Sequence, residues 1–280
     1  MTQHQPFRPN GLIALLTDFG VRDPFVGVMK GVILANFPHA RLVDLTHEIE
    51  PQDIQAGAFA LEGAWRYFPE GTTFVSVVDP GVGSKRDVIY GIREGRLFLA
   101  PDNGILSYVL RPDDPIYRLD IEKFALPERS STFHGRDIFA PAAGRLAMGF
   151  PPEFAGAPIE RVTRLERPRA RLDRDGSLCG EVVSIDRFGN LISSIAREDL
   201  RAFGGTQVDG LEVWVGTRNV GKIFRHYAEA KEGDALALVN SLGHLEVAVR
   251  AGSAAKTLGI ERRAPMRVRK IANKKSEGAK

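Results

Sequence analysis

Residues 72–83 decide the fold, and they have the sequence Thr72-Thr73-Phe74-Val75-Ser76-Val77-Val78-Asp79-Pro80-Gly81-Val82-Gly83. The β-branched and aromatic run at 72–78 favours a buried strand, and the Asp-Pro-Gly that follows it is typical of a turn. Apolar runs of strand length also occur at 12–17 and 41–45. Because amphipathic segments separate the three runs, the order strand, helix, strand, helix, strand predicts a parallel sheet with right-handed crossovers.

Both intervening segments carry helix signals. Asp23 is predicted to cap the first helix, with Pro24 in its first position, and Asp53 to cap the second, which runs to Phe68. Two short strands, 88–93 and 97–100, and a helix over 138–148 are expected to complete the first half of the chain.

The pattern changes after a segment rich in Pro and Arg between Phe150 and Pro168. From Ser177 onward, short strand-like segments alternate with Gly, Asn and Asp, which predicts a small β domain. We therefore expect an α/β protein. Its parts are an N-terminal, mostly parallel α/β sandwich domain (1–165), a smaller C-terminal antiparallel β-barrel-like domain (166–261) and a basic, disordered tail (262–280).

Charge and composition restrict the function. The tail carries eight Lys or Arg and one acidic residue, whereas residues 1–261 carry a net charge of −4, so nucleic-acid binding is expected only as a nonspecific contact of the tail. The lack of a long apolar run and the polar amino end predict a cytoplasmic protein that does not contact membranes. One cysteine, Cys179, and no His-Glu-x-x-His spacing argue against disulfides, a bound metal or a metal cofactor.

Polar residues directly follow the predicted parallel strands. These residues are Asp18, Thr46 with His47, and Asp79. Because ligands bind at the carboxyl ends of strands in open α/β sheets, this edge is the candidate pocket. Taken alone, Asp79 could instead belong to an ordinary turn, and His134 could be structural.

A second ambiguous segment lies in the predicted β domain. Asp186-Arg187-Phe188-Gly189-Asn190 is either a hairpin turn or a contact to a nucleobase, with Phe188 facing the ring and Asn190 bonding its edge.

Seven motifs of this chain occur in the order seen in the S-adenosylmethionine hydroxide adenosyltransferases, relatives of the fluorinases and chlorinases, and the chain resembles that family over roughly residues 11–260. They are Thr17-Asp18-Phe19-Gly20, Asp44-Leu45-Thr46-His47, Phe68-Pro69-Glu70-Gly71-Thr72, Val78-Asp79-Pro80-Gly81-Val82-Gly83, Pro101-Asp102-Asn103-Gly104, Phe133-His134-Gly135-Arg136-Asp137 and Asp186-Arg187-Phe188-Gly189-Asn190. The resemblance implies hydrolysis of S-adenosylmethionine to adenosine and methionine, with no cofactor, in a homotrimer. Its sites would lie between one subunit's first domain and a neighbour's second.

The resemblance also implies roles for individual residues. Asp79, Arg86 and His134 match the residues that handle the water, and Asp18 matches the carboxylate that holds the ribose hydroxyls. The remaining matches are Phe188 and Asn190 for adenine, Asp186 and Ser241 for the methionyl part, and Tyr227 and Glu246 as further substrate contacts.

Three alternatives to hydrolysis stay open. The first is halogenation of S-adenosylmethionine. Against it, halogenases of this superfamily lack the Asp, Arg and His set, and the halide-contacting Ser of the fluorinase lies at the position that matches Gly135. The second is a sensor that binds S-adenosylmethionine or a nucleoside without turnover. The third is an RNA-associated module that uses the basic tail. Hydroxide transfer is chemically sensible without a metal or general acid, since the sulfonium leaves as a neutral thioether.

Overall fold

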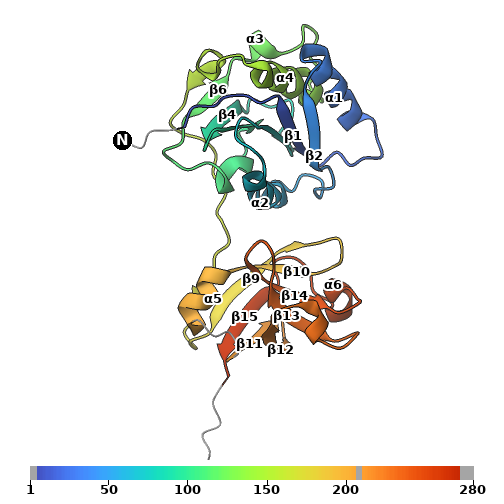
Figure 1. The fold of residues 1–280 in the computed structure, drawn as a ribbon, viewed down its shortest axis with the longest axis vertical. Coiled ribbons are helices and arrows are strands. Elements are labelled where there is room, and N and C mark those ends of the chain that lie inside the picture. The colour runs from blue at the N-terminus through green and yellow to red at the C-terminus, as the bar shows by residue number, and fades with distance from the viewer. Residues whose placement is uncertain (1–4, 206–209, 272–280) are drawn as a thin grey trace, which may run out of the picture. The chain divides into compact units, whose positions relative to one another are not determined.

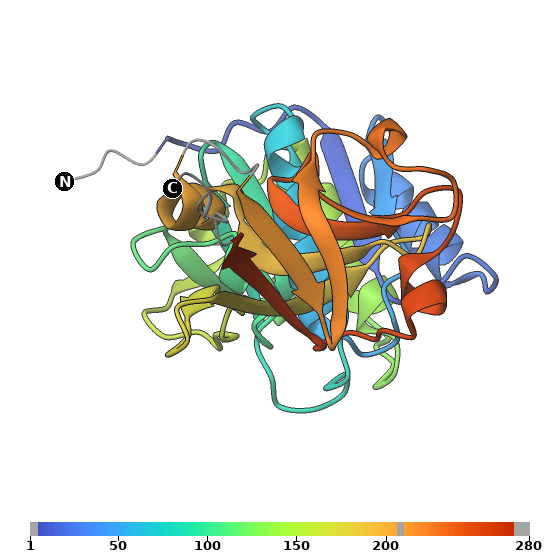
Figure 2. The same ribbon diagram turned by 90° about the horizontal axis from the view of Figure 1, so that it is seen from below.

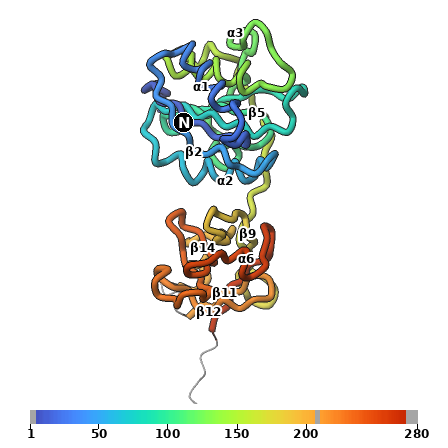
Figure 3. Tube along the Cα trace, turned by 90° about the vertical axis from the view of Figure 1, so that its right-hand side faces the viewer, coloured from blue at the N-terminus to red at the C-terminus, as the bar shows by residue number. Residues whose placement is uncertain are grey.

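The computed structural model describes residues 5–205 and 210–271. The chain divides into two compact units, Met1–Glu166 and Arg167–Lys280. Figure 1 shows that each unit is built around its own sheet, and Figure 3 traces the chain through both units from another side. The predicted fold class is confirmed, with an α/β first part and a β-barrel second part.

The first unit holds a seven-stranded sheet, among the residues that the structure describes, in the order β2-β1-β3-β5-β4-β6-β7. Neighbours from β2 to β5 are parallel, while β4, β6 and β7 are added antiparallel. The strands are β1 (Leu12–Thr17), β2 (Arg41–Thr46), β3 (Thr73–Val77), β4 (Val88–Arg93), β5 (Arg96–Pro101), β6 (Ile116–Leu119) and β7 (Gly156–Pro158).

Helices cover both faces of this sheet. Helices α1 (Phe25–Asn36) and α4 (Ala140–Met148) pack together on one face, and α2 (Ile54–Ala64) lies on the other, as Figure 1 shows. A short helix, α3 (Ile121–Phe124), packs beside α4. Successive residues of β3 pack into the cores on opposite faces of the sheet, because side chains alternate across a strand. This alternation makes the unit a sandwich with one core on each face of the sheet.

Three helix ends differ from the prediction. Helix α2 stops at Ala64, and only a 3₁₀ turn over Trp65–Tyr67 follows it, instead of a helix that runs to Phe68. Asp53 caps α2 as expected, accepting the Ala56 N–H at 2.8 Å. The expectation for Asp23 is wrong: the Pro24 carbonyl accepts the first helical bond, from Val28, so the cap falls one residue later. The helix expected from 138 begins earlier, with a π-helical turn at Gly135–Phe139 that leads into α4.

The second unit is a closed barrel. In the described part of the chain, seven strands follow one another as β10-β14-β13-β12-β11-β15-β9, and β9 pairs with β10 to close the ring, while β8 lies outside β9. All these pairs are antiparallel except β12 with β13. Figure 2 shows these strands from below. Their bounds are β8 (Arg171–Leu172), β9 (Leu178–Ile185), β10 (Leu191–Ala196), β11 (Leu211–Val215), β12 (Arg218–Phe224), β13 (Ala235–Val239), β14 (His244–Val249) and β15 (Pro265–Lys270).

Strand β15 corrects the predicted basic tail. Residues 265–270 were expected to be disordered, yet they pair with β11 and β9, and Met266 and Val268 are fully buried. Charged residues alternate with these apolar ones, so the positive charge lies on the outer side of a half-buried strand. The remaining tail prediction for 272–280 falls outside the described residues. None of the helices in residues 5–205 and 210–271 has the length and apolar character needed to cross a membrane.

Candidate active site

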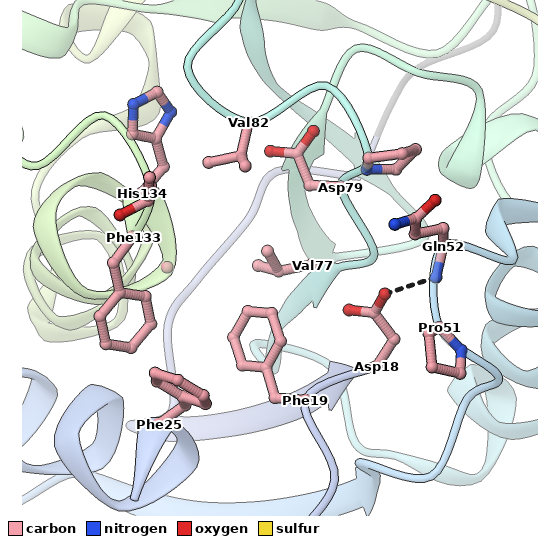
Figure 4. A pocket seen from close by; sticks show the side chains of 13 residues that line it. Asp18, Phe19, Phe25, Pro51, Gln52, Val77, Asp79, Val82, Phe133 and His134 are labelled. Carbon is pink, nitrogen blue, oxygen red and sulfur yellow. Dashed lines mark hydrogen bonds between the residues drawn. The ribbon is translucent and has the colours of Figure 1, made fainter. Parts of the chain in front are cut away.

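A cavity of about 420 Å³ opens in the first unit at the carboxyl ends of the parallel strands. Asp18 directly follows β1, Asp79 follows β3, and His134 comes from the loop before the π-helical turn; all three line the cavity (Figure 4). His47, which follows β2, is buried beside this edge rather than in the cavity lining. Of the residues expected at this edge, Asp18 and Asp79 therefore line one space together with the imidazole of His134, whereas Thr46 and His47 do not line it.

Asp79 and Arg86 form a buried ion pair beside the cavity. Arg86 Nε lies 2.9 and 2.8 Å from the two carboxylate oxygens of Asp79, and Nη2 donates to Oδ2 as well. Their side chains are only 4% and 9% exposed. Desolvating two charges is costly unless their geometry is good, so this multiple contact fixes both groups against each other.

His134 is joined to the same pair. Its Nδ1 lies 3.0 Å from Arg86 Nη2. A guanidinium can only donate, so Nδ1 accepts this bond and the neutral ring carries its proton on Nε2. Burial and the positive charge of Arg86 lower the pKa of His134, and the opposing charge of Asp79 does not compensate. His134 is therefore neutral at pH 7.

Asp18 is held by a residue that sequence reasoning missed. Its Oδ2 accepts the backbone N–H of Gln52 at 2.8 Å, drawn as the dashed line in Figure 4. Gln52 lines the cavity and has a φ of 68°, a backbone conformation that is uncommon for a non-glycine residue. The contact is made by a main-chain amide, so no side-chain pattern could have indicated it.

The wall opposite Gln52 is aromatic. Phe19, Phe25 and Phe133 meet edge to face, with centroid separations of 5.3 to 6.2 Å. Figure 4 shows the three rings grouped on one side of the cavity, away from the carboxylates of Asp18 and Asp79. The cavity thus offers both polar groups and ring faces, the combination that nucleosides require. Phe25, a helix residue, was not predicted to belong to the site.

Two further contacts fix the loop that carries Asp79. Asn103 Nδ2 donates to the Val78 carbonyl at 2.8 Å, so the Pro101-Asp102-Asn103-Gly104 motif anchors the chain just before Asp79. Gly83, with φ 79°, passes so close to the His134 loop that an added Cβ would lie 2.5 Å from the Ser131 carbonyl oxygen. Backbone contact therefore sets the spacing of the two loops.

The segment Asp186–Asn190 of the second unit, which was expected to be a hairpin turn or a nucleobase contact, is a tight turn with an exposed ring. Asp186 Oδ1 accepts the N–H groups of Phe188 and Asn190 at 2.9 and 2.8 Å, and Oδ2 accepts Asn190 Nδ2 at 2.9 Å. Phe188 is 75% exposed. The hairpin-turn interpretation and the binding interpretation are thus compatible, because the turn presents the ring to solvent.

A carboxyl group lies close to that turn. Glu246 is 3% exposed and accepts Tyr227 Oη–H at 2.7 Å and Asn240 Nδ2–H at 3.1 Å. Burial raises the pKa of Glu246, and the charge of Asp186 adds to this, whereas the two hydrogen bonds only partly offset it. Ser241 is exposed in the turn between β13 and β14. Asp186, Asn190, Tyr227 and Glu246 therefore share one region of the barrel.

Similarity to known proteins covers nearly the whole chain. Models of the SAM hydroxide adenosyltransferase N-terminal and C-terminal domains match residues 13–156 and 180–267. The (R)-S-adenosyl-L-methionine hydrolase of Thermus thermophilus is 40% identical, covering 91% of this chain and 98% of that protein. A fluorinase of Actinoplanes sp. is 30% identical, covering 87% and 92%. An uncharacterized conserved protein from Thermotoga maritima has a similar crystal structure, with a TM-score of 0.85, 32% identity and coverage of 91% and 99%.

Proposed function

Because this chain belongs to the S-adenosylmethionine hydroxide adenosyltransferase family, we propose that it hydrolyses S-adenosylmethionine to adenosine and methionine. The observation that supports this most is the hydrogen-bonded Asp79–Arg86–His134 set at a cavity that Asp18 also lines. In the reaction, the water oxygen bonds to C5′ as the C5′–S bond breaks. The electron pair of that bond stays on sulfur, methionine leaves as a neutral thioether, and one water proton is released.

The barrier lies with the nucleophile, since water is weak and must be aligned opposite the leaving sulfur. Arg86 places fixed positive charge where hydroxide character develops. His134 carries its proton on Nε2, because Nδ1 is occupied by Arg86, so the imidazole can donate to the water oxygen and orient it. The Asp79 carboxylate is the group of this set that is able to accept the water proton. The ring faces of Phe19 and Phe133 suit the sulfonium cation.

We further propose that binding uses both units. Asp18 holds the ribose hydroxyls in the first unit. In the second, the exposed Phe188 and Asn190 contact adenine; the remaining proposed contacts are Asp186 and Ser241 for the methionyl part, and Tyr227 and Glu246. A cytoplasmic homotrimer, in which a neighbouring subunit's second unit completes each site, would bring these groups together without a metal or cofactor.

The tight packing around Gly135 favours hydroxide over halide as the nucleophile. A Cβ added at Gly135 would lie 3.1 Å from Met29 Sδ and 3.2 Å from the rings of Phe133 and Phe19. A serine at this position, where the fluorinase has its halide-contacting hydroxyl, would have to displace these neighbours.

The test is product analysis in ¹⁸O-labelled water, with and without chloride and fluoride. We expect labelled adenosine and equimolar methionine under all conditions. A halogenated nucleoside would transfer the assignment to a halogenase, and unchanged substrate with measurable binding would indicate a sensor. Asp79→Asn should abolish turnover, while Asp87→Asn is the matched control, since Asp87 lies on the same loop and pairs at the surface with Arg118.

A further inference from the structure

We propose that His47 is a positioning residue for the turn Thr17–Gly20, acting through the Thr17 hydroxyl. The proposal rests on the function above in one respect: Asp18, in this turn, is the residue expected to hold the ribose. His47 follows β2 and is 3% exposed, and Thr17 ends β1 and is fully buried. Neither lines the cavity, so their influence on the substrate passes through the turn.

His47 is bonded to both ends of this turn. Its Nδ1 lies 2.8 Å from Thr17 Oγ1, and its carbonyl accepts the Gly20 N–H at 2.8 Å. Thr17 Oγ1 also accepts the Phe19 N–H at 3.2 Å. A single imidazole-bearing residue thus fixes the backbone on either side of Asp18.

The charge around His47 selects its tautomer. Nε2 lies 3.0 Å from Asp44 Oδ1, an electrostatic contact whose angle is outside regular hydrogen-bond geometry. Asp44 Oδ2 accepts from Lys30 at 2.7 Å. Burial alone would raise the pKa of Asp44, but the hydrogen bond from Lys30 and the electrostatic contact with His47 outweigh this and lower the pKa. An ionised Asp44 favours the proton on Nε2, which leaves Nδ1 to accept the Thr17 hydroxyl proton.

A break in strand pairing brings His47 to Thr17. Leu15 pairs with Asp44, but Leu16 pairs with Thr46, so Leu45 is an extra residue on β2. Bulges of this kind re-aim side chains and occur next to active sites. Because of the extra residue, the chain that follows β2 is shifted by one residue relative to β1, and His47 reaches the end of β1.

The turn also touches the catalytic side of the cavity. The Phe19 ring packs edge to face on Phe133, with centroids 6.1 Å apart, and Phe133 precedes His134. Loss of the Thr17 bond would therefore disturb the carboxylate of Asp18 and the aromatic wall together, although no group that touches the substrate is altered.

The experiment compares Thr17→Val, which keeps the shape and removes the hydroxyl, with Thr17→Ser, which keeps the hydroxyl. We expect Thr17→Val to weaken adenosine binding and raise KM for S-adenosylmethionine about tenfold, the effect of one lost hydrogen bond, with kcat changed less. Thr17→Ser should stay within about twofold of wild type. Thr72→Val is the matched control: this buried threonine donates to the Pro69 carbonyl at 2.7 Å, at the opposite end of β3.

The second arm uses His47→Leu and the double variant with Thr17→Val. If the two residues act as one unit, the double variant binds adenosine no worse than His47→Leu alone. Should His47→Leu fail to fold, the Thr17 series decides. Unchanged adenosine affinity in Thr17→Val, or an equal loss in Thr72→Val, overturns the proposal. Wild-type protein that binds adenosine but forms none from S-adenosylmethionine refutes hydrolysis alone. Wild-type protein that forms adenosine, with an unchanged KM in Thr17→Val, refutes the positioning role alone.

Discussion

Substitution of Gly83 by alanine tests whether backbone contact between two loops sets the geometry of the Asp79–Arg86–His134 set. Gly83 has a φ of 79°, which costs an alanine about 1–2 kcal/mol. Its new Cβ would lie 2.5 Å from the Ser131 carbonyl oxygen, closer than the 3.0 Å that real contacts respect. The Asp79 loop and the His134 loop must therefore separate by about 0.5 Å or more, and misplacements near 1 Å cost catalysis about 10²-fold.

The matched control is Gly233→Ala. Gly233 has nearly the same φ, 83°, but an added Cβ there meets no atom within 4 Å. Thermal unfolding should show a lower Tm in both variants, because the conformational penalty is shared, with the larger decrease in Gly83→Ala because of the added contact with Ser131. Turnover of S-adenosylmethionine should fall by about 10²-fold in Gly83→Ala alone. Equal turnover in the two variants would refute the claim that this contact positions the catalytic groups.

Further outcomes follow from the same geometry. Arg86→Met leaves the Asp79 carboxylate buried without its partner, so we expect loss of turnover and a free energy of unfolding lower by about 3–5 kcal/mol in urea titrations; pairing it with Asp79→Asn should recover stability but not activity. Because burial and Arg86 lower the pKa of His134 from 6.5, its neutral form persists below that pH. The acid limb of kcat/KM should thus lie below pH 6.5, and a limb above it would contradict this assignment. Truncation of 272–280 should leave adenosine formation unchanged, whereas truncation of 262–280 removes β15 and its two core residues and should abolish the cooperative unfolding of the second unit.

Periodicity and turn chemistry predicted most of the fold because both are local signals. The run at 72–78 and the Asp53 cap act over a few residues, and the structure confirms the strand and the cap. Strand β15 was missed since its outward Arg267 and Arg269 dominate a segment in which only two residues face the core. The bulge between β1 and β2 could not be predicted either, because it depends on pairing with another strand.

Within the candidate site as well, features that depend on local sequence could be predicted, and contacts between distant segments could not. The carboxylates could be located from strand ends, but two contacts that position them, the Gln52 amide on Asp18 and the close approach of Gly83 to the Ser131 carbonyl, belong to the main chain. The interpretation of the Asp79 loop as an ordinary turn and its interpretation as a functional site are therefore compatible. A carboxylate that is 4% exposed needs a partner in fixed geometry, since an uncompensated buried charge would destabilise the fold. The turn residues supply that geometry by returning Arg86 to Asp79, so the features that make the segment a stable turn are those that make the acid available for chemistry.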